Sequence, residues 1–427
     1  MEIKVKVASF LIALPLACMG AQYRFDFGAG AAEPGYTKVT PASKYSREAG
    51  FGLEDGSAVS AVDRGGPDKL RGDFLTSDKP FYFSVAVPEG NYRVTVILGD
   101  REGESDTTVK AELRRLMLEK VHTDRGNFAY RNFVVNVRTS KIAGGGEVKL
   151  KDREKTSEAW AWDEKLTLEF SNARPAVAGV EIVRVEDVPT VYLAGDSTVT
   201  DQPKEPHNSW GQMLPRFFGD RVAIANHSES GESLHSFIGE RRLAKVMSVI
   251  KPGDFLIVQM GHNDEKLKGD GVGAFTTFKA ELKQFVAEAR QHGANPILVT
   301  PMHRRTFDSD GKITNSHGDF PEAVRQAAKE EKVPLIDLTA LSKTLYEAMG
   351  PAESVKAFAP GDGTHHNSWG SYELARCVVE TIRKSDLGLS KFLAGDVKAF
   401  NPAAPDPLAK FDIPASPGIT TVKPYGN

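Results

Sequence analysis

Cysteine is scarce in this chain of 427 residues, which contains only Cys18 and Cys377. Two thiols cannot build a disulfide framework or a thiolate metal cluster. The chain also lacks an excess of either charge, because 54 lysine and arginine residues nearly balance 57 aspartate and glutamate residues. A strongly basic surface, which nucleic-acid binding requires, is therefore not expected. The length suits a globular protein of two or three domains.

Long apolar runs are missing after the first twenty residues, and none there reaches the roughly 20 residues that span a bilayer. The start of the chain has two lysines, then an apolar stretch over 7–19 that ends in small residues. This pattern predicts a signal peptide at 1–21 and an exported protein, periplasmic or secreted. A lipoprotein anchored through Cys18 and a cytosolic protein with a buried start are the alternatives. Pro15 argues against the lipoprotein, because a lipobox prefers a branched aliphatic residue there.

Two motifs are also absent, and their absence narrows the chemistry. No Gly-x-Ser-x-Gly sequence occurs, so an ordinary α/β-hydrolase assignment loses its main motif. No His-Glu-x-x-His sequence occurs either, and the ten histidines do not cluster apart from the adjacent pair His365 and His366. We therefore expect neither a metal site nor a cofactor.

The region 22–187 consists of short β-rich runs separated by turn residues, which predicts an all-β sandwich domain. Two of these runs, 81–87 and 92–98, are joined by Pro-Glu-Gly-Asn and indicate a hairpin. One helix is expected in this region, over 108–121.

The region 188–390 alternates strands with helices, and the tail 391–427 is rich in proline. The expected strands are 191–194, 222–225, 255–259, 296–300 and 333–338. Five such units predict a five-stranded parallel sheet with helices on both faces, in an α/β domain. Ligands bind at the carboxyl ends of such strands. The tail is expected to lie extended on the surface or to be partly disordered.

Polar residues follow these strands in an order that suits acyl transfer. Ser197 follows the first strand on a sharp turn, and Gly231 lies in the loop after the second. Asn263, whose amide offers two donors to an oxyanion, follows the third. Asp362 and His365 are spaced so that the carboxylate can hold one imidazole nitrogen and leave the other as a base. Each signal alone is as easily a helix cap, an Asx-turn or a surface histidine, but together they supply every part of the reaction.

These motifs resemble the SGNH (GDSL-type) hydrolases, and more narrowly their rhamnogalacturonan acetylesterase branch. The matching segments are 192–201, 259–266, 300–307 and 362–365, within a region from about 188 to 385. One departure is Glu232 after Gly231, where many members carry Arg, and it bears on substrate preference. The resemblance implies a flavodoxin-like three-layer α/β/α domain. The preceding sandwich is similar to the galactose-binding-like domains found in some members.

The resemblance also implies roles for the strand-end residues. Ser197 is the expected nucleophile, His365 its base, and Asp362 the carboxylate that orients the imidazole. The backbone N–H groups of Ser197 and Gly231, with the Asn263 side chain, form the expected oxyanion hole. The implied function is the removal of O-acetyl groups from an acetylated plant polysaccharide, above all rhamnogalacturonan. An esterase for acetylxylan or an acyl lipid, and a non-catalytic carbohydrate-binding protein, are the alternatives.

Candidate substrate contacts lie beside the same blocks. Arg304 and Arg305 are candidates for binding uronate carboxylates, with surface ion pairs as the alternative. His262 either lines the cleft or braces its own loop, and the bracing role is preferred. Trp210 and Trp369 either stack on sugar rings or pack in the core, and core packing is the simpler expectation.

Overall fold

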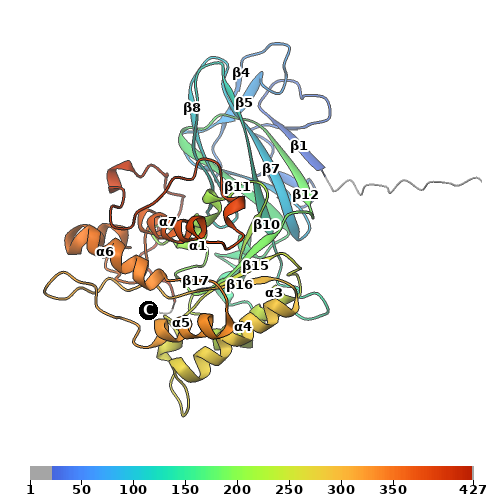
Figure 1. Ribbon diagram of the computed structural model, residues 1–427. Coiled ribbons are helices and arrows are strands. Elements are labelled where there is room, and N and C mark those ends of the chain that lie inside the picture. The colour runs from blue at the N-terminus through green and yellow to red at the C-terminus, as the bar shows by residue number, and fades with distance from the viewer. Residues whose placement is uncertain (1–21, 426–427) are drawn as a thin grey trace, which may run out of the picture.

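The computed structural model describes residues 22–425, which form a β-rich N-terminal part and an α/β C-terminal part (Figure 1). The predicted signal peptide and Cys18 lie outside the described residues. Within 22–425, no helix combines the length and the apolar character needed to cross a membrane.

The N-terminal part is built from two packed sheets, which confirms the expected β-rich domain. One sheet has the strand order β10-β7-β12-β1-β2, with β5 and β4 joined to it through β12, and the other has the order β3-β6-β11-β8-β9. Alternate residues along the strands, such as Val94, Val96 and Phe170, point into the shared core. The strands are β1 (Gln22–Phe27), β2 (Thr37–Val39), β3 (Phe51–Leu53), β4 (Ser60–Asp63), β5 (Asp73–Thr76), β6 (Phe81–Ala86), β7 (Gly90–Gly99), β8 (Ser105–Ala111), β9 (Arg115–Thr123), β10 (Phe128–Val137), β11 (Lys165–Arg174) and β12 (Val177–Val185).

The helix expected over 108–121 is wrong, because β8 and β9 form an antiparallel hairpin there. The turn between them includes Glu112 and Arg114, whose φ angles of 56° and 62° a helix does not allow. Four charged side chains of this hairpin are buried: Lys110, Glu112, Arg114 and Arg115. Lys110 lies 3.4 Å from Glu169. The contacts that hold these charges come from distant parts of the chain, so local periodicity does not reveal them.

The C-terminal part is an α/β domain whose five strands all pair in parallel, in the order β17-β16-β15-β13-β14. These strands do not form a separate sheet, because β14 also pairs with β10 of the N-terminal part, at Ile224 and Val135. The ladder therefore runs without a break from one part into the other. The strands are β13 (Thr190–Gly195), β14 (Ala223–Asn226), β15 (Phe255–Gln259), β16 (Asn295–Val299) and β17 (Leu335–Ile336).

Helices cover both faces of these parallel strands (Figure 1). Alternate strand residues face two separate cores: Leu193 and Ile257 belong to one, and Ala194 and Val258 to the other. The first core includes residues of α1 (Trp210–Met213), α6 (Leu338–Ser354) and α7 (Ser368–Lys384). The second includes residues of α2 (Leu234–Gly239), α3 (Arg242–Met247), α4 (Lys279–Gln291) and α5 (Phe320–Glu331).

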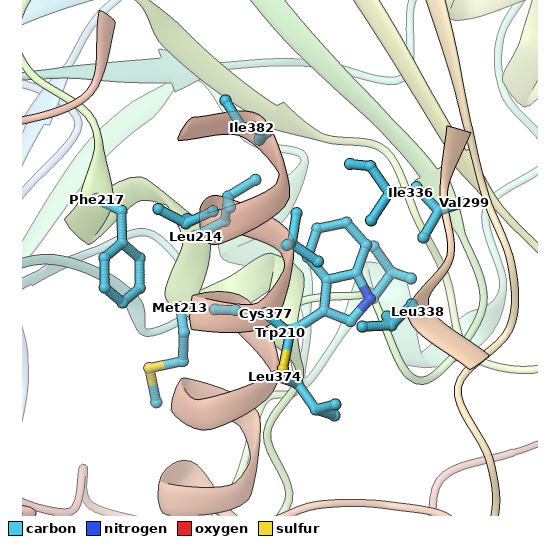
Figure 2. Close-up of a cluster of buried hydrophobic side chains, with 14 of the residues drawn as sticks. Trp210, Met213, Leu214, Phe217, Val299, Ile336, Leu338, Leu374, Cys377 and Ile382 are labelled. Carbon is cyan, nitrogen blue, oxygen red and sulfur yellow. The ribbon is translucent and has the colours of Figure 1, made fainter. Parts of the chain in front are cut away.

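Trp210 lies within the first core, surrounded by apolar side chains of α7 and of the strands (Figure 2). Its Nε1 donates a hydrogen bond to Gln259 Oε1 at 2.7 Å, and the side chain is fully buried. Trp210 is therefore a core residue and not a platform for sugar.

Trp210→Ala is expected to lower the free energy of unfolding by about 3–5 kcal/mol, because it leaves a large cavity and a buried Gln259 Oε1 without its donor. Urea unfolding followed by circular dichroism measures this loss. A loss below about 1 kcal/mol would show that the core collapses around the site, contrary to the packing described.

The proline-rich tail contacts both parts of the molecule. Ile419 pairs with Glu205 in a short parallel bridge on the C-terminal part. Ser416 Oγ lies 2.7 Å from Lys110 Nζ and 2.7 Å from a Glu169 carboxylate oxygen of the N-terminal part. As far as residue 425, where the described chain ends, the segment has no regular structure apart from short 3₁₀ turns at Ser390–Phe392 and Leu408–Lys410. It does not lie wholly on the surface as expected, because Phe400 and Ile413 are buried in the first core. The domain boundaries themselves stay predictions.

Candidate active site

Ser197, His365 and Asp362 meet at the carboxyl ends of the parallel strands. His365 Nε2 lies 2.8 Å from Ser197 Oγ, and His365 Nδ1 lies 2.9 Å from Asp362 Oδ2. Ser197 lies two residues after the end of β13, whereas the other two residues lie in the loop before α7. All three residues are at most 4% exposed. The arrangement is that of a nucleophile, its base and an orienting carboxylate.

The backbone around Asp362 keeps this carboxyl ionised. Its Oδ1 accepts hydrogen bonds from the N–H groups of Thr364 at 2.8 Å and His365 at 3.1 Å. Burial would raise the pKa of Asp362, but the hydrogen bonds from His365 and from these N–H groups hold it well below its usual range. A carboxylate at this position stabilises an imidazolium that forms beside it. The loop is also braced by Arg305, whose backbone N–H donates to Gly363 O at 2.7 Å.

Asp196 and His262 support the turn that carries Ser197. Asp196 Oδ1 accepts hydrogen bonds from the Thr198 N–H at 2.9 Å and the Thr198 hydroxyl at 2.7 Å. Asp196 Oδ2 lies 3.3 Å from His262 Nδ1. Burial opposes ionisation of Asp196, yet His262 and Thr198 lower its pKa to about 2. His262 is 1% exposed and contacts the nucleophile turn through Asp196. A contact with substrate stays a prediction.

The expected oxyanion donors lie in adjoining loops. Gly231 has a φ of 83°, a left-handed conformation that favours glycine. Asn263 Nδ2 donates at 2.9 Å to the carbonyl of Glu232, the residue that follows Gly231. An amide NH₂ has two hydrogens, so this bond fixes the side chain and uses only one of them. Gln202 Nε2 connects the loops by donating to Ser197 O at 2.7 Å and Ser230 Oγ at 3.4 Å.

Arg304 and Arg305 are held by the protein itself. The Arg304 guanidinium lies 2.6 Å from Glu265 and donates to Ser316 O at 3.1 Å. Arg305 Nη1 donates to Pro351 O at 3.3 Å. Arg304 thus forms the ion pair that is the alternative to uronate binding, and a substrate role for either arginine stays a prediction.

Two further aromatic residues beside the motifs face the core. His366 Nε2 lies 2.8 Å from Tyr346 Oη, and its ring packs on Phe358 with centroids 4.0 Å apart. Burial lowers the pKa of His366 to about 3, so the ring stays neutral. Trp369 is 5% exposed and belongs to the same apolar core as Trp210.

Sequence reasoning missed several residues that surround this site. The ring of His207 lies 6.1 Å from that of His365, centroid to centroid, and burial lowers its pKa to about 4. Lys151 and Arg153 of the N-terminal part contact the Ser230 carbonyl. None of the three lies in a motif, and only the folded chain brings them to the site. In residues 22–425, no group of three or more His, Cys, Asp or Glu side chains is arranged to hold a metal ion.

Each of the two parts of the chain matches a known protein family. Residues 193–371 match the GDSL-like lipase/acylhydrolase family, and residues 23–142 match the galactose-binding domain-like region of β-agarase/YXIM esterase-like proteins. The rhamnogalacturonan acetylesterase RhgT of Bacillus subtilis is 40% identical over 218 residues, which cover 48% of this chain and 93% of RhgT. The uncharacterized esterase YxiM of the same organism is 28% identical over 384 residues, 86% of this chain and 91% of YxiM.

The crystal structure of Bacillus subtilis YxiM matches 85% of this chain and 98% of its own, with 26% identity and a TM-score of 0.46. The region 193–371 that the family model matches includes Ser197, Asp362 and His365. The chain therefore belongs to the GDSL-like lipase/acylhydrolase family and is a carboxylic ester hydrolase with an N-terminal galactose-binding-like domain.

Proposed function

We propose that this protein is an exported carbohydrate esterase that removes O-acetyl groups from a plant cell-wall polysaccharide, with rhamnogalacturonan as its substrate. The observation that carries the esterase chemistry is the pair of hydrogen bonds that joins Ser197 to His365 and His365 to Asp362. The substrate is supported by RhgT, a rhamnogalacturonan acetylesterase that is 40% identical to this chain over 218 residues. Export is supported by the signal-like pattern of residues 1–21.

The geometry suggests how the reaction proceeds. Ser197 Oγ attacks the acetyl carbonyl carbon while His365 Nε2 accepts the hydroxyl proton. The oxyanion of the tetrahedral intermediate accepts hydrogen bonds from the backbone N–H groups of Ser197 and Gly231 and from Asn263 Nδ2. His365 then gives its proton to the sugar oxygen, which leaves as a hydroxyl. Water activated by His365 cleaves the acetyl–Ser197 ester, which releases acetate and restores the enzyme.

Asn263→Ala is expected to lower kcat by about 10²–10³-fold and to change KM little, because the amide acts on the transition state. Asn315→Ala is a suitable control, since Asn315 is exposed and its amide donates to Gly318 O. Steady-state hydrolysis of an aryl acetate measures both variants. A rise in KM with unchanged kcat would contradict the oxyanion role.

The substrate is tested by measuring acetate released by the wild-type enzyme from acetylated rhamnogalacturonan, acetylated xylan and an aryl acetate. We expect the highest kcat/KM on rhamnogalacturonan. Faster release from acetylated xylan would contradict rhamnogalacturonan as the preferred substrate but would still support a polysaccharide deacetylase. Release from the aryl ester alone would contradict a polysaccharide substrate.

A further inference from the structure

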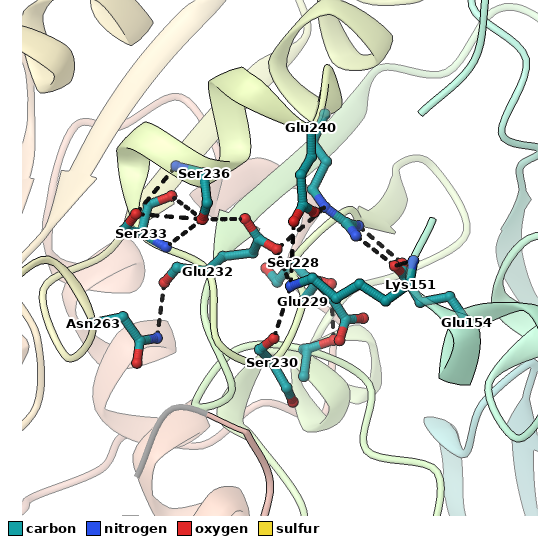
Figure 3. Close-up of polar contacts among 12 residues, drawn as sticks. Lys151, Glu154, Ser228, Glu229, Ser230, Glu232, Ser233, Ser236, Glu240 and Asn263 are labelled. Carbon is teal, nitrogen blue, oxygen red and sulfur yellow. Dashed lines mark hydrogen bonds and ion pairs between the residues drawn. The ribbon is translucent and has the colours of Figure 1, made fainter. Parts of the chain in front are cut away.

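A loop of the N-terminal part packs against the loop that carries Gly231. This loop is anchored by Glu154, which binds Arg242 of α3 through two hydrogen bonds of 2.9 and 2.5 Å. Both side chains of the ion pair are fully buried. Trp162 Nε1 also donates to Glu154 Oε1 at 2.9 Å. The loop is therefore fixed on the esterase domain, and Lys151 of the same loop lies beside the segment that carries Ser230 and Glu232 (Figure 3).

Two cations of this loop converge on one carbonyl oxygen. Lys151 Nζ donates to Ser230 O at 3.1 Å, and Arg153 Nη2 donates to the same oxygen at 2.6 Å. Each cation is in turn held by a buried carboxylate. Lys151 pairs with Glu232, and Arg153 Nε lies 2.9 Å from Glu229 Oε1. Because each cation that binds the Ser230 carbonyl is itself held by a carboxylate, the carbonyl oxygen has a fixed position.

The Ser230 carbonyl shares its peptide unit with the Gly231 N–H, the expected oxyanion donor. Among residues 22–425 the cis peptide bond is Glu205–Pro206, so the 230–231 unit is trans. In a trans unit the C=O and N–H point in opposite directions. The Gly231 N–H therefore points away from Lys151, and Figure 3 shows Asn263 and Lys151 on opposite sides of this segment.

We propose that Lys151 and Arg153 are positioning residues, through which the N-terminal domain orients and polarises the Gly231 N–H for the oxyanion. The inference rests on the proposed role of Gly231 in ester hydrolysis. Charge-assisted hydrogen bonds to the carbonyl fix the peptide plane and draw electron density from the amide nitrogen. A preorganised and polarised donor stabilises the transition state more than the ground state. The Glu232 that departs from the family pattern provides the partner of Lys151.

Lys151→Met and Arg153→Met test this role, with Lys149→Met as the matched control. Lys149 is exposed and also crosses to the esterase domain, where it donates to Gly239 O at 2.9 Å, but it does not contact the 230–231 peptide. On an aryl acetate, each test variant is expected to lose about 10-fold in kcat, and the double variant about 10²-fold, with KM unchanged. Lys149→Met keeps the wild-type kcat. Lys151→Arg, which can still donate to the carbonyl, restores most of the activity.

A second measurement observes the peptide directly. Ser230–Gly231 is the only Ser–Gly pair in the sequence, so labelling serine carbonyl carbon with ¹³C and glycine nitrogen with ¹⁵N selects one amide signal. We expect the ¹⁵N signal to move upfield in Lys151→Met and Arg153→Met, because the carbonyl loses a donor, and to stay in place in Lys149→Met.

An unchanged kcat with an unmoved amide signal would overturn the proposal. An equal loss of activity in all three methionine variants, in proportion to a fall in Tm, would also overturn it. That result would show that these lysine and arginine side chains only dock the two domains on each other. A folded wild-type protein without esterase activity contradicts the proposed function instead, and the amide signal then still decides whether the two cations hold this peptide.

Discussion

Ser197→Ala is expected to lower kcat for ester hydrolysis by about 10⁶-fold, the loss typical of an enzyme deprived of its serine nucleophile. The Ser197 hydroxyl is the group that His365 Nε2 contacts at 2.8 Å, so alanine leaves the base with no proton to accept. The fold should be unaffected, because the substitution removes one oxygen from a turn that Asp196 holds through Thr198.

Ser228→Ala is the matched control for this variant. Ser228 lies in the loop after β14, and its buried hydroxyl has no hydrogen-bond partner within residues 22–425. Its loss should leave kcat unchanged. A Ser197→Ala enzyme that kept more than about 1% of the wild-type kcat would show that another group attacks the ester.

Asp362→Asn is expected to lower kcat by about 10⁴-fold while the backbone geometry is kept. Asparagine can still accept the backbone hydrogen bonds from Thr364 and His365 through its oxygen. Its NH₂ group then faces His365 Nδ1, which must become the acceptor, so the proton moves to Nε2 and the imidazole can no longer accept the Ser197 proton.

Aryl acetate hydrolysis and thermal unfolding of Asp362→Asn separate the two effects of this change. We expect a Tm close to that of the wild type together with the loss of kcat. A loss below 10-fold with the fold intact would contradict the role of Asp362 in setting the tautomer of His365.

The candidate site could be predicted because its residues follow strands in short, local motifs. Ser197 and Asn263 each lie within four residues of a strand end, and Asp362 and His365 share one loop. In a parallel sheet the strand ends lie along one edge, so the motifs after β13 and β15 are expected to lie close together. The loop of Asp362 and His365 follows α6 instead, and its Asp-x-x-His spacing is what identifies it as the partner of Ser197. The separation between them in sequence does not weaken this argument.

The hairpin of β8 and β9 could not be predicted in the same way. A helix is expected over 108–121, yet this segment is a hairpin in which Arg115 lies buried 3.0 Å from Asp201 of the other domain. The Lys151 and Arg153 contacts are hidden for the same reason, because each reaches more than 70 positions along the chain to Ser230. Tertiary partners override local preference at these positions.

Acetate release from acetylated rhamnogalacturonan, measured with the wild-type enzyme beside Ser197→Ala, tests the central claim most directly. We expect the wild type to release acetate in proportion to enzyme concentration and the variant to release none above the buffer. Undiminished release by Ser197→Ala, or no release by a folded wild-type enzyme, would contradict the assignment of this protein as a Ser197-dependent polysaccharide deacetylase.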